Sequence, residues 1–295
     1  MRTSSGWESI LPNLLRGKRP ERWPSQAILT IRPLPLDRID GPMVFKRLFG
    51  RKEEIAPRIW SVPEGQRIYA IGDIHGRLDL LDQLILQIEQ DNASRNRVRT
   101  QIVFLGDLCD RGPNSRGVIE RVMQLASASS DVRLIAGNHE ELLIRAWEGD
   151  RRSVGLINRV GGRETMLSYG VDEVKYDEAD TDELLEMLVT HIPESHIAFL
   201  KGADDWIVAG DYLFVHAGIR PGDAIEEQRT SDLRWIRREF TDFEGSHGMM
   251  VVHGHTITED VEERVNRIGI DTGAYASGKL TALGLEGEER WFLQT

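Results

Sequence analysis

Residues 67–76 read RIYAIGDIHG, a short apolar run that ends in Asp73 and His75 between two glycines. The apolar run is typical of a buried β-strand, and the leucines and isoleucines of residues 78–88 recur at the spacing of one helix face. We therefore predict a strand, a polar loop and a helix in succession, with the acid and the histidine at the carboxyl end of the strand.

The same arrangement occurs twice more along the chain. The apolar run 101–105 precedes Gly-Asp-Leu-Cys-Asp-Arg-Gly at 106–112, and the run 132–135 precedes Gly-Asn-His-Glu at 137–140. Three such units predict a parallel sheet with right-handed crossovers, in which the loops after the strands meet at one edge. We expect the three polar loops to be neighbours in the fold.

The second half of the chain has a different pattern. Residues 150–200 show helical spacing and many acids, which predicts a helical cap insert over the site. Short apolar runs then return at 206–208, 212–215, 249–252, 268–270 and 280–285. We predict an α/β fold, a four-layer α/β/β/α sandwich of two packed sheets, and the alternative is one continuous mixed sheet.

Five polar blocks at predicted strand ends carry carboxylate, amide and imidazole groups. They are the segments 72–76, 106–112, 137–140, 216–218 and 254–256. Such donors without thiolate suit two adjacent divalent ions, with Mn favoured and Fe or Zn as alternatives. A pair of these ions can hold the attacking and leaving oxygens of a displacement at phosphorus. The residues therefore predict metal-assisted hydrolysis of a phosphate ester.

The composition limits the classes of partner. The 295-residue chain is 40% hydrophobic, which allows one substantial core. A net charge of -11 argues against double-stranded DNA as a partner. The single cysteine, Cys109, excludes an intrachain disulfide and favours a cytoplasmic location. We expect neither a signal peptide nor a transmembrane segment, and the oligomeric state stays open.

Residues 1–60 differ in composition from the rest of the chain. They contain twelve Lys or Arg against six Asp or Glu, with several prolines and no clear period. We predict a disordered basic extension, followed by a catalytic domain at 61–295. Met43 opens a short basic amphipathic segment, so we expect residues 1–42 to be dispensable. The alternative is a tail that docks a partner or an anionic membrane surface.

From about residue 67 to the last residue, the five blocks in this order resemble the phosphoprotein phosphatase family of the calcineurin-like metallophosphoesterases. The pair Asp110-Arg111 is similar to the pair in bacterial and bacteriophage lambda type serine/threonine phosphatases. Symmetrical diadenosine tetraphosphatases share the metal blocks but usually lack this pair.

The resemblance implies hydrolysis of phosphomonoesters, with phosphoserine or phosphothreonine in proteins as the first choice. Small phosphoesters and the symmetrical cleavage of diadenosine tetraphosphate are the enzymatic alternatives. A rival of another class is a non-catalytic scaffold that binds phosphopeptides. Loss of a metal ligand or of His139 would indicate such a scaffold, and none of these residues is missing from the sequence.

The resemblance also implies roles for individual residues. It assigns Asp73, His75 and a bridging Asp107 to one metal, and Asp107, Asn138, His216 and His255 to the other. It implies direct attack on phosphorus by a hydroxide that bridges both metals. His139 is expected to be the general acid, with Asp110 orienting its ring and raising its pKa.

Two arginines are expected to hold the phosphate, together with Asn138. Arg111 is the first, although Asp110 and Arg111 can instead form a local ion pair at the start of the next helix. The resemblance supplies the second in Arg237, with Arg234 and Arg238 as alternatives in the same segment. His253 lies two residues before His255 and faces the same side of a strand. The resemblance favours His255 as the ligand and leaves His253 packed nearby.

Overall fold

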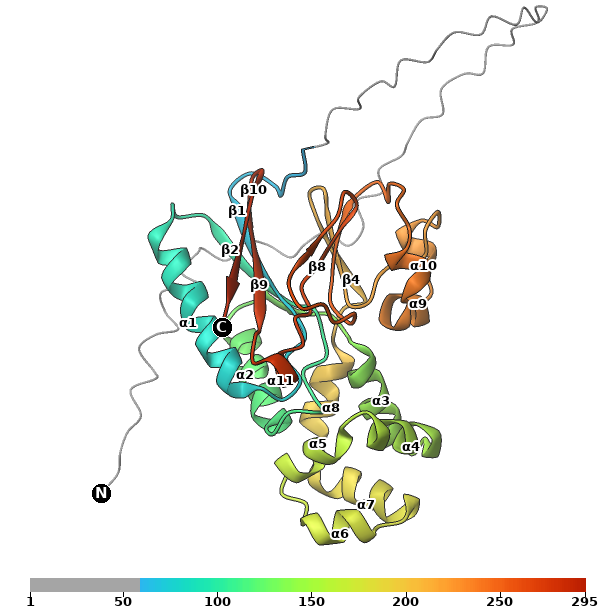
Figure 1. The fold of residues 1–295 in the computed structure, drawn as a ribbon. Helices are drawn as coiled ribbons and strands as arrows, with labels where there is room; N and C mark the ends of the chain where they lie inside the picture. Colours follow the sequence, from blue (N-terminus) through green and yellow to red (C-terminus); the bar gives the residue numbers. More distant parts are fainter. Residues whose placement is uncertain (1–58) are drawn as a thin grey trace, which may run out of the picture. The chain divides into compact units, whose positions relative to one another are not determined.

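The computed structural model describes residues 59–295. Our predictions for residues 1–42 and for the basic extension fall outside this part of the chain. The described strands form two five-stranded mixed sheets (Figure 1). The first contains β1 (Gln66–Ile71), β2 (Arg99–Phe104), β3 (Val132–Leu134), β9 (Thr281–Glu286) and β10 (Glu289–Gln294). The second contains β4 (Trp206–Ala209), β5 (Tyr212–Val215), β6 (Met250–His253), β7 (Glu262–Glu263) and β8 (Arg267–Gly269).

The order of strands in the first sheet is β10-β9-β1-β2-β3. Strands β1, β2 and β3 are parallel, and β9 runs antiparallel to β1. Helices α1 (Leu78–Ser94) and α2 (Ser115–Ala128) make the two crossovers. The loops after the three parallel strands therefore lie at one edge, as predicted from the repeated pattern.

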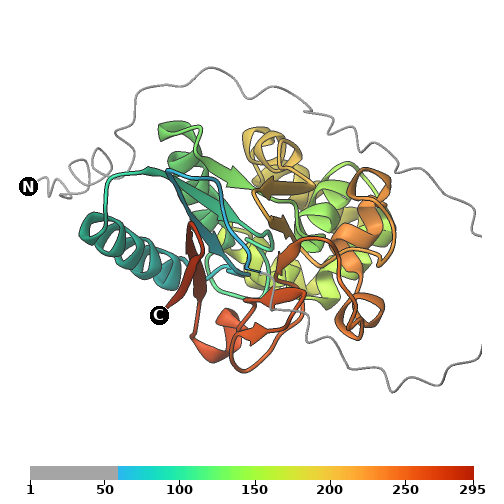
Figure 2. The same ribbon diagram turned by 90° about the horizontal axis from the view of Figure 1, so that it is seen from above.

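Successive side chains of a strand point to opposite faces of its sheet. The two sheets therefore lie between three clusters of hydrophobic core. In β1, Ile68 and Ala70 pack between the two sheets, whereas Tyr69 and Ile71 pack toward α1 and α2. In β5, Phe214 packs between the sheets, and its neighbours Leu213 and Val215 pack toward α9 (Thr230–Trp235) and α10 (Arg238–Thr241). The layers are thus helix, sheet, sheet and helix, which confirms the predicted sandwich (Figure 2).

Within the described residues, a single backbone bridge joins the two sheets. Ile135, directly after β3, forms a single parallel bridge with Asp204, directly before β4. Asp204 donates its N–H to the carbonyl of Leu134 over 2.8 Å, and its carbonyl accepts from Ala136 N over 2.8 Å. One bridge does not make a ladder, so the alternative of one continuous mixed sheet is wrong.

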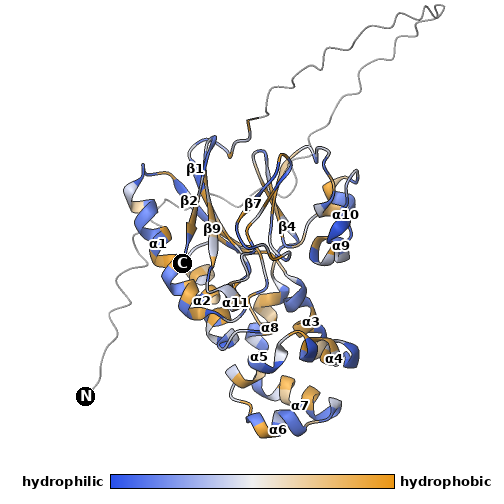
Figure 3. Cartoon of the chain, in the orientation of Figure 1, coloured by the Kyte–Doolittle hydropathy of each residue, from blue (hydrophilic) through white to orange (hydrophobic). Residues whose placement is uncertain are grey.

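The segment between β3 and β4 is helical. It contains α3 (Asn138–Trp147), α4 (Arg151–Arg159), α5 (Gly162–Ser168), α6 (Glu173–Glu178), α7 (Thr181–His191) and α8 (Glu194–Lys201). Buried residues of these helices belong to the same core cluster as α1 and α2. In Figure 3, α1 and α7 carry both hydrophobic and hydrophilic residues, as expected of helices that bury one face.

Two short elements complete the second half. They are a 3-10 turn at Ile225–Glu227 and helix α11 (Ala274–Ser277). Within residues 59–295, no helix has the length and apolar character needed to cross a membrane.

Candidate metal centre

The loops at the sheet edge contain unusual backbone conformations. Among residues 59–295, the non-glycine residues with a left-handed backbone are His75 (φ 45°), Asp107 (51°), Asp110 (71°), Arg111 (69°) and His255 (62°). A side chain in this region of φ costs about 1–3 kcal/mol, and such residues concentrate at functional sites. All five belong to the blocks that the sequence predicts as the site.

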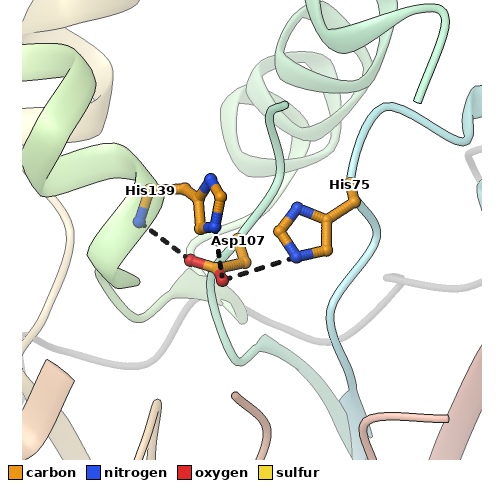
Figure 4. Close-up of side chains that lie close together, drawn as sticks. All are labelled: His75, Asp107 and His139. Atoms are coloured by element: carbon orange, nitrogen blue, oxygen red, sulfur yellow. Dashed lines mark hydrogen bonds and ion pairs between the residues drawn. The ribbon is translucent and has the colours of Figure 1, made fainter. Parts of the chain in front are cut away.

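Asp107 lies at the centre of two groups of buried donors. His75 and His139 form the first group with it, and His216 and His255 form the second. Figure 4 shows the first group: His75 Nε2 lies 3.5 Å and His139 Nε2 3.8 Å from Asp107 Oδ2. On the other side, His216 Nε2 lies 3.5 Å from Asp107 Oδ1. The two carboxylate oxygens thus face different histidines.

The imidazoles are oriented by their second ring nitrogens. His75 Nδ1 lies 2.7 Å from the carbonyl of Cys109, and His216 Nδ1 lies 2.8 Å from the carbonyl of Leu105. Metal-binding histidines are typically held in this way, with the other nitrogen directed at the ion. His255 Nε2 is buried and has no hydrogen-bond partner within residues 59–295. These observations fit two adjacent cations around Asp107.

The charges around Asp107 also fit bound cations. Burial raises the pKa of Asp73, and the neighbouring carboxylates of Asp271 and Asp107 raise it further. Burial opposes ionisation of Asp107, but the imidazoles of His216 and His139 outweigh it and hold the pKa below its usual range. Burial lowers the pKa of His75 to about 3. Crowded carboxylates beside a neutral imidazole are the donors that a divalent ion requires.

The other two predicted ligands lie in the same place. The carboxylate of Asp73 accepts the backbone N–H of His255 over 3.0 Å at Oδ2. Asn138, the first residue of α3, has its Oδ1 3.0 Å from His216 Nε2. The structure therefore brings all six predicted ligands together, although the two groups of acidic and histidine donors contain His139 and leave out Asp73.

His139 is held beside this centre by Asp110. Its Nδ1 lies 2.6 Å from Asp110 Oδ2, and its Nε2 lies 3.1 Å from a guanidinium nitrogen of Arg111. Burial disfavours the charged ring, but the carboxylates of Asp107 and Asp110 outweigh it and raise the pKa of His139. Thr165 of α5 fixes Asp110 by donating its hydroxyl to Oδ1 over 2.6 Å.

Arg237 and His253 are the remaining residues that the sequence singled out near this site. Arg237 is exposed between α9 and α10, and its charge contributes to lowering the pKa of His255, after burial and His216. His253 is buried, and its ring packs edge-on against Phe240 with 5.0 Å between centroids. It belongs to neither donor group in the described part of the chain.

Sequence reasoning assigned no role to two buried acids of this site. Glu140 accepts backbone N–H groups from Asp107 (2.8 Å), Leu108 (2.8 Å) and Gly137 (2.9 Å). Its position, three residues after the glycine that precedes α3, is the signal of a capping box. Asp271 follows β8, and its carboxylate lies close enough to Asp73 to raise the pKa of that group. Its signal was an acid at the end of an apolar run.

Comparisons with known proteins agree with this geometry. A model of the calcineurin-like phosphoesterases matches residues 66–267. The chain is 29% identical over 230 residues to the asymmetrical bis(5'-nucleosyl)-tetraphosphatase PrpE of Bacillus thuringiensis, covering 72% of this chain and 88% of that protein. It is 27% identical over 223 residues to the protein of the same name from Oceanobacillus iheyensis, covering 73% and 87%.

A solved structure of a candidate diadenosine tetraphosphatase superposes with a TM-score of 0.53 at 20% identity, covering 77% of this chain and 93% of that chain. At this identity the likeness concerns the fold. The family that the motifs predicted is confirmed by the match over residues 66–267. The chain belongs to the calcineurin-like phosphoesterase family.

Proposed function

We propose that this protein is a dinuclear metal-dependent hydrolase of dinucleoside polyphosphates. The reaction class rests on one observation, which is that Asp107 is shared by two groups of buried donors. The proposed ligands are Asp73, His75, Asp107, Asn138, His216 and His255. Two divalent ions bound there would polarise the phosphoryl oxygens and generate a nucleophile from water. Because the donors are oxygen and imidazole, we favour Mn, with Fe or Zn as alternatives.

The proposed general acid is His139. Nδ1 faces Asp110, and Nε2 faces Arg111 and Asp107. Once Arg111 turns to the phosphate of the substrate, Nε2 can carry a proton toward the leaving oxygen. The pKa of His139, raised by the carboxylates of Asp107 and Asp110, favours the protonated ring. Arg111 next to Nε2 is the proposed phosphate clamp, because a guanidinium can hold two non-bridging oxygens. Arg237 is the proposed second clamp.

The relatives favour a nucleotide over a phosphoprotein as substrate. The proteins of B. thuringiensis and O. iheyensis are both named asymmetrical tetraphosphatases, and the match covers nearly nine-tenths of each. Asymmetrical cleavage of a dinucleoside tetraphosphate consumes one water and releases a nucleoside monophosphate and a nucleoside triphosphate. Symmetrical cleavage, our alternative from the sequence, would release two nucleoside diphosphates.

A phosphoserine or phosphothreonine protein remains the second candidate substrate. It is supported by the intact pair Asp110-Arg111, both of whose side chains contact His139. The non-catalytic scaffold is disfavoured, because every predicted ligand and the acid are present and buried together. The single buried cysteine, Cys109, supports our expectation of a reducing cytoplasm.

One assay panel tests the proposal. The Mn-loaded protein is offered diadenosine tetraphosphate, a phosphothreonine peptide and 4-nitrophenyl phosphate, and the nucleotide products are separated by anion-exchange chromatography. We expect the highest kcat/KM for the dinucleotide, with AMP and ATP as products. Release of two ADP molecules would refute asymmetrical cleavage. A kcat/KM higher for the peptide than for the dinucleotide would refute the nucleotide substrate. The Asp107→Asn variant controls for contaminating phosphatases.

A further inference from the structure

A groove of about 660 Å³ opens beside the candidate metal centre. It is lined by the segment 76–79 with Asp82, at the start of α1, and by the segment 111–114 before α2. Tyr275 of α11 completes the lining. Its volume lies in the usual range for sites that bind small molecules.

The groove begins at the catalytic residues. Arg111, which lines it, reaches within 3.1 Å of His139 Nε2. The ring of Tyr275 lies edge-on to the ring of His75, with 5.5 Å between centroids. A substrate whose phosphorus lies at the centre, and which extends beyond one phosphate, can therefore continue into this groove.

The end next to the centre is cationic. No carboxylate among residues 59–295 forms an ion pair with Arg111, whose guanidinium lies 4.8 Å from the centroid of the Tyr275 ring. Arg77 is fixed in place, because it donates to both oxygens of Asp79 (2.9 and 2.7 Å) and to the carbonyl of Ala274 (3.0 Å). Arg111 can therefore hold a phosphate, whereas the charge of Arg77 is already paired with Asp79.

The groove also carries carboxylates, which a pure phosphate site would avoid. Asp79 and Asp82 both line it, and their side chains are 61% and 38% exposed although each pairs with an arginine. Exposed carboxylates accept hydrogen bonds from hydroxyl groups, and the two hydroxyls of a ribose are suitable donors. The lining therefore matches a ligand that is anionic at one part and hydroxylated at another.

From this arrangement we infer that the groove binds one nucleoside polyphosphate arm of the substrate. A phosphate lies on Arg111, the ribose hydroxyls reach Asp79 and Asp82, and Tyr275 provides the aromatic wall for the base. This inference rests on the proposed function, because it requires a substrate that contains a nucleoside.

The test compares substrates with and without a nucleoside. We measure KM and kcat of Mn-loaded Tyr275→Ala and Asp82→Asn for diadenosine tetraphosphate and for inorganic tripolyphosphate, and we measure ADP binding by calorimetry. Loss of base stacking is expected to raise KM for the dinucleotide about tenfold in Tyr275→Ala. The rise for tripolyphosphate should be much smaller, and ADP binding should weaken in parallel with the dinucleotide.

Two controls separate this effect from damage to the centre. Tyr275→Phe retains the ring and should retain the low KM, and Glu120→Gln removes an ion pair with Arg116 on α2, outside the groove. An equal rise in KM for diadenosine tetraphosphate and for tripolyphosphate in Tyr275→Ala would overturn the groove assignment. A wild-type protein that cleaves tripolyphosphate but no dinucleotide would instead refute the proposed function, and ADP binding sensitive to Tyr275 and Asp82 would still support the groove.

Discussion

Glu140→Gln tests how the loop that carries Asp107 is held. Both oxygens of Glu140 accept buried backbone N–H groups, two on Oε2 and one on Oε1, so the carboxylate form matches all three donors. An amide has one acceptor oxygen, and its NH2 group must then face an N–H donor. The variant loses at least one charge-assisted bond of about 1.5–3 kcal/mol and leaves a buried N–H unpaired. We expect a loss of stability of about 2–4 kcal/mol.

Urea unfolding of the metal-free protein, followed by circular dichroism, measures this loss. The matched control is Glu183→Gln, because Glu183 accepts the N–H of Asp180 (2.8 Å) in a capping box at the exposed start of α7. Water can replace the lost acceptor at this exposed position, so we expect Glu183→Gln to lose less than about 0.5 kcal/mol of unfolding free energy. Since global stability is about 5–15 kcal/mol, Glu140→Gln should still fold. A loss below about 1 kcal/mol, or equal losses in both variants, would refute the reasoning.

Four further outcomes are expected. Asp107→Asn should leave less than about 10% of wild-type turnover and less Mn per chain by plasma mass spectrometry, because the bridging charge is lost; normal metal content with high activity would contradict the shared ligand. His139→Gln should lower turnover of alkyl phosphates far more than of 4-nitrophenyl phosphate, whose leaving group needs no proton, and equal losses would remove His139 from the acid role. Mn at about 1,000 times its Kd should raise the free energy of unfolding by about 4 kcal/mol relative to a chelator-treated sample. An unchanged midpoint of urea unfolding would exclude binding to the folded state. Gly155→Ala in the middle of α4, where an added Cβ meets no atom within 4 Å, should raise stability by about 0.5–1 kcal/mol in urea unfolding; destabilisation would show that α4 is not helical there.

The fold was predictable where side chains follow a clear period. The runs before residues 72, 106 and 137 are apolar and lead into amphipathic helices, so β1 to β3 and their shared edge could be derived from the sequence. Strand β10 was not predicted from the sequence, because it is an edge strand whose residues are partly buried or exposed and therefore show no apolar pattern. Strand β7 has two residues and no pattern at all.

The site was predictable to the extent that its ligands follow strands. Asp73 and Asp107 each come one glycine after an apolar run of neighbouring parallel strands, so the topology of the first sheet alone brings their backbones together. His216 follows β5 of the second sheet, so it reaches Asp107 only through the packing of the two sheets. Asp271 reaches Asp73 only because the two sheets pack face to face. That packing depends on side-chain fit across the interior, which a sequence pattern does not reveal.

The left-handed loop residues raise the question of what offsets their strain. The loop after β1 is bonded directly to the loop after β2, since His75 N donates to the carbonyl of Asp107 over 2.9 Å and Gly76 N donates to that of Leu108 over 2.9 Å. Arg111 N donates to the carbonyl of Gly161 over 2.9 Å, which ties the same loop to the start of α5. Net contributions of about 0.5–1.5 kcal/mol for each bond are comparable with the cost of each unusual φ. The protein's own contacts therefore position the backbones of the proposed ligands, and a bound cation would relieve the repulsion among the carboxylates of Asp73, Asp107 and Asp271.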